Sequence, residues 1–240
     1  MTDILNKKME RRTRIKICGL TRAGDVRAAA EAGADALGFV FYPQSPRYIM
    51  PDAARALIMT VPPFVSTVGL FVNATEQEVV EIVARTGISM LQFHGDESAE
   101  YCARVAAITG RPFIRAFRVK ADTSPQDLIQ CERTYRAASA YFAGLLLDSW
   151  SEAYGGTGKA FNWSLVSKEI AHQVVLSGGL SAQNVAGAIK RVQPWAVDVS
   201  SGVESSRGIK DAGKVRAFVS AVNAADQASG QFKDRQDAAS

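Results

Sequence analysis

Short apolar runs alternate with amphipathic stretches along most of the chain. Eight of the runs have the length and the branched aliphatic content of buried β-strands. Apolar positions three and four residues apart, which are typical of helices, fill the stretches between them. The predicted strands span residues 14–18, 35–41, 67–72, 89–93, 112–119, 143–148, 173–178 and 195–200. The predicted helices span residues 23–32, 51–60, 75–86, 97–109, 124–138, 161–168, 181–191 and 208–224.

Residues at the helix ends support this assignment. Asn73 or Thr75 can cap the helix over 75–86, and the acidic residues that follow complement the helix dipole. Pro51 fits the first turn of its helix, where a missing N–H costs little. Glycines in "AGA" and "TGI" stand where helices are expected to end.

Strands that alternate with helices predict parallel strands joined by crossover connections. Several of the strands are apolar almost throughout, as expected for strands that are buried on both faces. Eight such units within 240 residues favour a single closed (β/α)₈ barrel over residues 14–224. The competing arrangement is an open, doubly wound sheet, which usually has fewer strands, and no GxGxxG fingerprint follows the first strand.

The two ends of the chain have a different composition. The net charge is +4, and residues 1–14 alone carry +3 of it. A protein that binds nucleic acid usually has its basic face on the folded part, so we expect no nucleic-acid partner. We expect residues 1–13 to be a basic, flexible segment of undetermined role and residues 225–240 to be a disordered polar tail. No apolar run reaches the roughly 18 residues of a membrane span, and the basic segment lacks the apolar core of a secretory signal.

Cysteine usage predicts a reducing compartment. The three cysteines are an odd number at wide spacing, which argues against a disulfide framework. We therefore expect a cytoplasmic protein. No Cys and His residues have metal-ligand spacing, so no metal site is predicted. Cys102 and Cys131 lie in helical patterns and are expected to be small buried apolar residues.

Polar and reactive side chains follow the predicted strands. Cys18 ends the first strand, Arg47 follows the second, His94 follows the fourth and Asp148 ends the sixth. In a barrel of this kind the active site lies at the carboxyl ends of the strands. Core packing alone does not require reactive residues at these positions, and the pattern therefore predicts an active site there.

Cys18 and Asp148 are the candidate acid and base. A thiolate can remove a proton from carbon, and a carboxylic acid can donate one to a leaving ring oxygen. Such a thiol, which ordinarily titrates near ~8.5, would need help from a positive charge, which Arg47 or Lys16 could supply. An acid would need its pKa raised by burial or by nearby negative charge. The alternatives are a buried structural thiol at Cys18 and a loop cap at Asp148.

Glycine-rich sequences follow the sixth, seventh and eighth strands. They are "YGGTGKAF" at 154–161, "SGGLS" at 177–181 and "SSGVES" at 200–205. Such loops expose backbone N–H groups, and the loops after strands seven and eight commonly bind phosphate in barrels. Three such loops favour phosphate binding over simple turns. The candidate residues are Gly155, Gly156, Gly158, Gly178, Gly179, Ser201 and Gly202.

Four further ionisable residues lead to expectations of their own. Arg47 follows a proline-stiffened turn and could clamp a carboxylate, with an ordinary surface arginine as the alternative. His94 could contact substrate or cap a loop. Strand alternation places Lys16 on the same face as Cys18, and strand eight neighbours strand one in a closed barrel. We therefore predict an ion pair between Lys16 and Asp198 inside the barrel.

The motifs together resemble those of the phosphoribosylanthranilate isomerase family. They are "KICGLT", "GFVFYPQSPRYI", "GLFVN", "LQFHGDE", "LLLDS", "GGTGKAFNW", "LSGGL" and "VDVSSGVE", in order and at fitting separations. The resemblance covers residues 14 to 224, and no motif position departs from it. It implies a TIM-barrel enzyme of tryptophan biosynthesis, an aldose-ketose isomerase that acts on N-(5-phosphoribosyl)anthranilate by an Amadori rearrangement. The product would be 1-(o-carboxyphenylamino)-1-deoxyribulose 5-phosphate.

The resemblance also implies roles for individual residues. Asp148 would be the general acid that opens the furanose ring, and Cys18 the general base that removes the C2 proton. Arg47 would hold the anthranilate carboxylate, the glycine loops would cradle the phosphate, and His94 would lie near the substrate. No metal or organic cofactor is implied, because the substrate nitrogen serves as the electron sink.

Other functions remain open at this point. The related isomerase of histidine biosynthesis resembles this family in reaction but has aspartate at the first strand tip, so Cys18 argues against it. A barrel that only binds phosphate ligands would need neither Cys18 nor Asp148. Acceptance of the histidine-pathway substrate and the oligomeric state are not predicted by the sequence.

Overall fold

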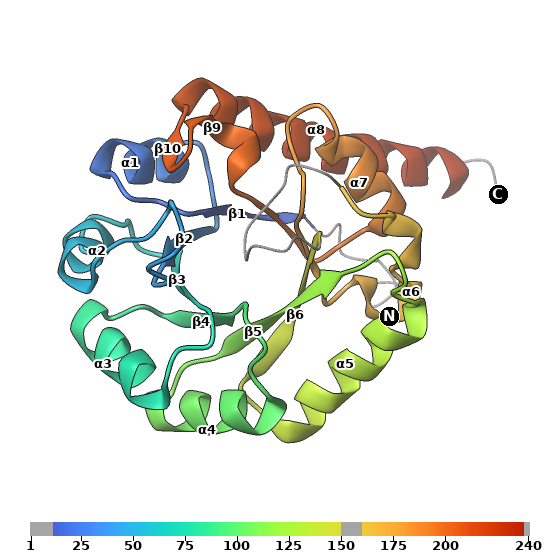
Figure 1. Cartoon of the computed structure of the whole chain (residues 1–240). Helices are drawn as coiled ribbons and strands as arrows, with labels where there is room; N and C mark the ends of the chain where they lie inside the picture. Colours follow the sequence, from blue (N-terminus) through green and yellow to red (C-terminus); the bar gives the residue numbers. More distant parts are fainter. Residues whose placement is uncertain (1–11, 150–159, 238–240) are drawn as a thin grey trace, which may run out of the picture.

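The computed structural model describes residues 12–149 and 160–237, with side chains through residue 228. Eight parallel strands pair in chain order, and β8 pairs with β1, so the predicted (β/α)₈ barrel is confirmed. Figure 1 shows the strands at the centre and the helices as an outer ring. The strands are β1 Arg14–Cys18, β2 Ala36–Val40, β3 Ser66–Phe71, β4 Met90–Phe93, β5 Phe113–Val119, β6 Phe142–Ser149, β7 Val175–Leu176 and β8 Ala196–Val199.

The helices begin and end at residues with clear capping roles. Thr75 and Glu78 form a capping box at the start of α3, and Gly87 ends that helix in the left-handed conformation. Pro51 stands in the first turn of α2, as predicted. None of the described helices is long and apolar enough to cross a membrane. The helices are α1 Ala23–Glu31, α2 Pro51–Ile58, α3 Glu76–Thr86, α4 Ala99–Thr109, α5 Pro125–Ala138, α6 Lys168–Ala171, α7 Val185–Val192 and α8 Ala212–Asp237.

The largest difference from the sequence prediction lies between β6 and β7. The predicted helix over 161–168 is wrong: a 3₁₀ turn, Trp163–Leu165, precedes the short helix α6. Asn162 accepts a hydrogen bond from the Ser164 N–H and so caps the turn, and Val166 then adopts an extended conformation. Local side-chain bonds of this kind compete with a continuous helix.

Two further elements differ from the sequence prediction: strand β7 is shorter than predicted, and a hairpin follows β8. Strand β7 has two residues rather than the six predicted over 173–178, because Gly178 and Gly179 have φ of 80° and 66° and leave the extended conformation. After β8, the chain forms a hairpin that the hydrophobic pattern did not predict. Its strands are β9 Glu204–Ser206 and β10 Ile209–Lys210.

Alternation along the strands divides the apolar residues into two layers. Ile15 and Ile17 of β1 belong to the large core between barrel and helices. Leu146 and Ile114, by contrast, belong to a small cluster with Val175 and Ala196 that is separate from this core. The inner cluster fills part of the barrel, as in other barrels of this size. Polar residues occupy the same inner face nearer the carboxyl ends of the strands.

The residue that precedes β1 is hydrogen-bonded to the last helix, α8. The Thr13 N–H and the Thr13 hydroxyl both donate to the Asp226 carboxylate, at 2.7 Å each. Asp226 lies in the segment 225–240 that we expected to be a disordered tail, and the backbone instead continues as helix α8 through Asp237. Alanine and glutamine in this segment favour a helix, and Thr13 gives it a tertiary contact. Residues 1–11 lie outside the described part of the chain.

Replacing Asp226 by alanine should destabilise the fold, because two hydrogen bonds to a charged acceptor are lost. We expect a loss of about 1–3 kcal/mol in the free energy of unfolding, which corresponds to roughly 2–12 °C in Tm for a chain of this size. Calorimetry or thermal circular dichroism measures this shift. The matched control is Gln227→Ala, an exposed neighbour on the same helix, and equal Tm values for the two variants would contradict the assigned contact.

Candidate active site

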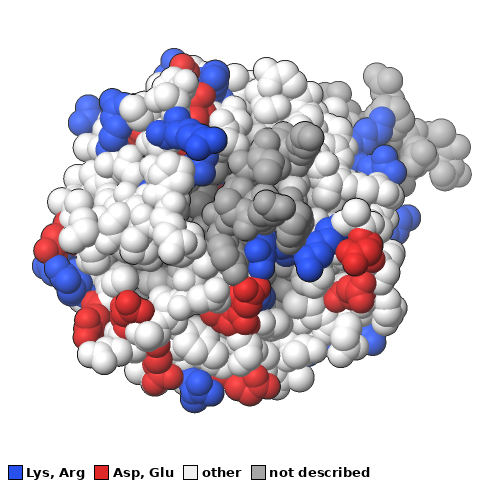
Figure 2. Space-filling model, in the orientation of Figure 1, with Lys and Arg blue, Asp and Glu red and all other residues white. Residues whose placement is uncertain are grey.

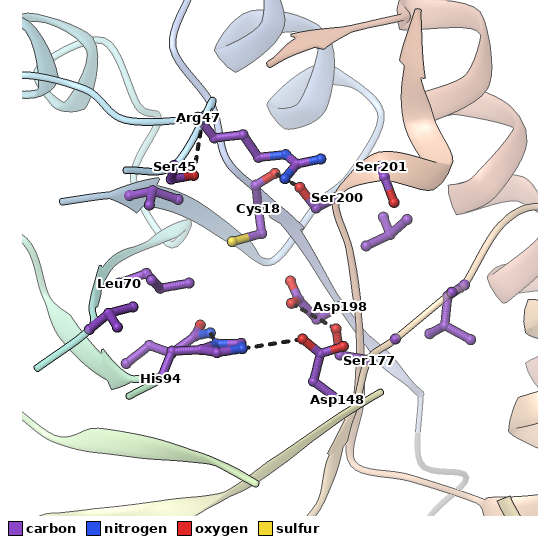
Figure 3. A pocket seen from close by; sticks show the side chains of 17 residues that line it. Cys18, Ser45, Arg47, Leu70, His94, Asp148, Ser177, Asp198, Ser200 and Ser201 are labelled. Atoms are coloured by element: carbon purple, nitrogen blue, oxygen red, sulfur yellow. Dashed lines mark hydrogen bonds and ion pairs between the residues drawn. The ribbon is translucent and has the colours of Figure 1, made fainter. Parts of the chain in front are cut away.

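The carboxyl ends of the strands meet at one pocket, which Figure 3 shows from close by. Cys18, Arg47, His94 and Asp148 all line it, as the sequence analysis predicted for a common site. The Cys18 sulfur and the Asp148 carboxyl lie on opposite sides of the pocket (Figure 3). The candidate phosphate residues Gly178, Gly179 and Ser201 line it as well. Gly155, Gly156 and Gly158 lie outside the described residues.

A buried ion pair lies beneath Cys18. Lys16 Nζ is 2.9 Å from Asp198 Oδ1, with 5% and 6% of the two side chains exposed. The two residues face each other directly across the β1–β8 pairing, so the predicted pair is confirmed. Ser177 Oγ donates a further hydrogen bond to Asp198, at 3.2 Å. Gly38 leaves room for the Cys18 and Lys16 side chains, because a Cβ atom at this position would lie 2.8 Å from the Cys18 sulfur.

The charges around Cys18 act on its pKa in opposite directions. Burial raises the pKa of the thiol, the Lys16 ammonium lowers it, and the Asp198 carboxylate raises it, with burial the largest effect. The net direction is upward. Burial also disfavours the charged form of Lys16, but Asp198 and Cys18 outweigh it and raise the Lys16 pKa. Lys16, one of the two cations that the sequence suggested, lowers the pKa of Cys18 more than Lys210 does, and both favour the thiolate.

Both oxygens of Asp148 have hydrogen-bond partners. The Ser149 N–H donates to Oδ1 at 2.8 Å, and His94 Nε2 lies 3.2 Å from Oδ2. Gln92 Nε2 lies 2.9 Å from His94 Nδ1, so a chain of three side chains ends at Asp148. Both Gln92 and His94 are buried. His94 lines the pocket and its partner there is Asp148, while contact of His94 with the substrate stays a prediction.

Arg47 reaches the pocket from the loop after β2 and pairs with a carboxylate of the hairpin. Its Nε and Nη2 atoms donate to Glu204 Oε1 and Oε2, at 2.7 and 2.9 Å. Glu204 also binds Lys210 Nζ at 2.9 Å. Arg47 is therefore no free surface arginine, since only 12% of its side chain is exposed.

Two glycine-containing loops form one wall of the pocket. The N–H groups of Gly178, Gly179, Ser201 and Gly202 donate to no other residue in the described part of the chain. Asn184 braces the first loop, since its Nδ2 donates to the Gly179 carbonyl at 2.8 Å. A Cβ at Gly202 would lie 2.0 Å from the Leu180 carbonyl oxygen, so the two loops touch at this glycine.

Several residues of the site were not identified from the sequence. Gln92, Ser177 and Ser200 line the pocket, and Glu204 and Lys210 lie behind Arg47. Alternation was a usable signal for Gln92, which lies two positions before His94 along the chain. No local signal could identify Glu204, which is 157 residues from Arg47 in sequence.

Comparison with known proteins gives a consistent result. The family model described as N-(5'-phosphoribosyl)anthranilate (PRA) isomerase matches residues 15–221. A protein named N-(5'-phosphoribosyl)anthranilate isomerase from Herminiimonas arsenicoxydans is 63% identical over 92% of this chain and 97% of its own length. The crystal structure of phosphoribosyl anthranilate isomerase from Thermotoga maritima is 40% identical, with a TM-score of 0.79, and covers 88% of this chain and 99% of its own.

A second solved structure carries a ligand. It is phosphoribosyl anthranilate isomerase in complex with reduced 1-(o-carboxyphenylamino)-1-deoxyribulose 5-phosphate. It is 37% identical to this chain, with a TM-score of 0.75 and coverage of 88% of this chain and 99% of its own. The match of the family model over most of the barrel, together with the high identity of full-length relatives, shows that this chain belongs to the N-(5'-phosphoribosyl)anthranilate isomerase family, whose members are isomerases of tryptophan biosynthesis.

Proposed function

We propose that Cys18 and Asp148 are the base and the acid with which this isomerase converts N-(5'-phosphoribosyl)anthranilate into 1-(o-carboxyphenylamino)-1-deoxyribulose 5-phosphate. The observation that carries the proposal is the placement of the thiol and the carboxyl on opposite sides of one pocket (Figure 3). Two groups that face a substrate from opposite sides can move two different protons without exchanging them directly. The small-molecule sugar phosphate then lies between them.

The first step opens the sugar ring. The Asp148 carboxyl donates its proton to the furanose ring oxygen, the bond between that oxygen and C1 breaks, and the nitrogen lone pair forms a C=N bond. The Cys18 thiolate then removes the C2 proton, and the electron pair forms a C1–C2 double bond while the C=N electrons return to nitrogen. The resulting enolamine loses its O2 proton and gains a proton at C1, which gives the ketone. No electrons are lost or gained overall.

The hydrogen bonds that join Gln92, His94 and Asp148 are compatible with both protonation states of Asp148. When Gln92 donates to His94 Nδ1, the histidine carries its proton on Nε2 and donates to an ionised Asp148. Gln92 Oε1 then has no partner among the described residues. If the amide turns over, Oε1 accepts from Nδ1–H, and Nε2 accepts the proton of a neutral Asp148. We therefore assign Gln92 and His94 to holding the acid before and after proton transfer.

The anionic ends of the substrate have separate places in this proposal. The four amides of Gly178, Gly179, Ser201 and Gly202 suit a phosphate, which accepts several N–H donors. Arg47, whose guanidinium lies above Cys18 and next to Ser200 (Figure 3), suits the anthranilate carboxylate. Figure 2 shows basic side chains gathered over α1 and the hairpin β9–β10. Basic side chains on this side favour the approach of an anionic ligand.

Removing either proton-transfer group should strongly slow turnover while leaving binding largely intact. We expect Cys18→Ala and Asp148→Asn each to lower kcat by about 10²–10⁴-fold, the usual contribution of general acid or base catalysis. Steady-state kinetics measures kcat. Calorimetry with the reduced product analogue reports binding, which should change little because neither residue carries a ligand anion. Wild-type turnover in either variant would refute the assigned roles.

The raised pKa of Cys18 predicts how its reactivity depends on pH. Only the thiolate reacts with iodoacetamide, so the rate rises with pH and should reach half its maximum above ~8.5, the ordinary pKa of a free thiol. The experiment uses a Cys102→Ala, Cys131→Ser background, although burial also raises the pKa values of those two thiols, to about 12 and about 11. A midpoint at or below ~8.5 would show that the neighbouring cations balance or outweigh burial, contrary to our account.

Gly202→Ala should impair phosphate binding, because the new methyl group must push the Leu180 carbonyl away. We expect the inhibition constant of inorganic phosphate to rise by about tenfold, roughly the free energy of one hydrogen bond to a charged group. The control is Gly187→Ala in α7, where a Cβ meets nothing within 4 Å. Inhibition by phosphate that is the same in the two variants would place the phosphate elsewhere.

A further inference from the structure

The guanidinium of Arg47 is occupied on one edge only. Nε and Nη2 donate to the two oxygens of Glu204, whereas Nη1 donates to no residue in ranges 12–149 and 160–237. A guanidinium offers five donors in a rigid plane, so fixing one edge fixes the direction of the remaining donors. The Glu204 pair therefore decides which way the free Nη1 end of Arg47 points.

Glu204 is itself held in place. Lys210 Nζ lies 2.9 Å from Glu204 Oε1, and the Lys210 side chain is 1% exposed. The same ammonium donates to the Ser200 carbonyl and to the Ser200 hydroxyl, at 3.1 and 3.2 Å. All three donors of the ammonium are thus used. Burial works against the ionised form of Glu204, but Arg47 and Lys210 outweigh it and lower the Glu204 pKa.

The stem of Arg47 is confined as well. A Cβ at Gly19 would lie 2.4 Å from Arg47 Cδ, so the absence of a side chain at Gly19 makes room for the aliphatic part of Arg47. Ser45 Oγ accepts from the Arg47 N–H at 3.1 Å. At the turn of the hairpin, a Cβ at Gly208 would lie 2.8 Å from the Pro46 carbonyl oxygen, and that turn is joined to Thr21 by a hydrogen bond of 3.0 Å.

We propose that Glu204, held by Lys210 on the hairpin β9–β10, is the positioning residue that aims Arg47 at the carboxylate of the substrate and so determines selectivity for a carboxylated aromatic amine. The inference rests on the proposed function, since it takes Arg47 as the carboxylate ligand. Glu204 does not touch the substrate. Its effect on binding is transmitted through the guanidinium.

A purely structural role for Glu204 makes a different prediction. A structural pair stabilises the pocket as a whole, so its loss weakens every ligand by a similar factor. A positioning pair fixes the direction of one guanidinium, so its loss weakens only ligands that carry the carboxylate. Glu204→Gln separates the two cases, because glutamine keeps the size of the side chain but turns an –NH₂ group toward Arg47 Nη2, and two donors then face each other.

The experiment measures Kd by calorimetry for two ligands in the full-length protein. One is reduced 1-(o-carboxyphenylamino)-1-deoxyribulose 5-phosphate, and the other is the same compound without its carboxyl group. The ratio of the two Kd values reports how much the carboxylate contributes. In the wild type we expect a ratio of about 10–100, the usual contribution of a hydrogen bond to a charged group. In Arg47→Met the ratio should fall close to one.

For Glu204→Gln we expect the ratio to fall below about a third of the wild-type value, with the Kd of the decarboxylated ligand nearly unchanged. The control is Glu132→Gln, which removes a comparably buried glutamate that pairs with Arg136 on α5, away from the pocket. The control should keep the wild-type ratio. If Glu204→Gln fails to fold, Glu204→Asp keeps the charge and shortens the reach, and its ratio should also fall.

The outcomes separate this inference from the proposed function. A wild-type ratio near one would remove Arg47 as the carboxylate ligand and the inference with it. A high wild-type ratio that Arg47→Met abolishes and both Glu204 variants retain would overturn the positioning role and leave the proposed function intact. An equal loss for both ligands in the Glu204 variants would overturn it as well, because it shows a structural role.

Discussion

Closure of the parallel sheet between β1 and β8 is the constraint on which the site depends. The closing pair places Lys16 directly opposite Asp198, with both side chains buried. Two charges in such a place persist only if they neutralise each other, because an isolated buried charge is costly. The pair fixes the seam of the barrel and sets the charge beneath Cys18. Because all strands run the same way, their carboxyl ends lie at one end of the barrel. Asp148 and Cys18 therefore both line the pocket at that end.

Other ionisable groups around the pocket are also paired with a neighbouring side chain. Ionisable groups at and beneath the pocket have partners that limit how they can move: His94 for Asp148, Asp198 for Lys16, and Glu204 for Arg47. Buried polar groups are expected to be satisfied in this way, and the partners also determine direction. In an active site, direction matters as much as charge, because proton transfer and carboxylate recognition both require fixed geometry. The supporting residues are therefore part of the chemistry that we propose.

The fold could be predicted from the sequence because the signals that determine it are local. Apolar runs that end in polar residues placed Cys18 and Asp148 at strand tips, and alternation with closure predicted the Lys16–Asp198 pair. The rest depended on contacts between distant segments. Nothing in "SSGVESSRGIK" distinguishes a hairpin from a loop, and the partner of Glu204 lies 157 residues away. The 3₁₀ turn that Asn162 caps was not predicted either, because apolar residues with helical spacing continue across this segment.

A crystal structure of this chain with reduced 1-(o-carboxyphenylamino)-1-deoxyribulose 5-phosphate tests the central claim most directly. Our account predicts the Cys18 sulfur beside C2 of the ligand and the Asp148 carboxyl near the oxygen that leaves the ring. The carboxylate would lie on Arg47 and the phosphate on the amides of Gly178, Gly179, Ser201 and Gly202. A ligand bound in the reverse direction, or with Cys18 and Asp148 on the same side of its sugar carbons, would contradict it.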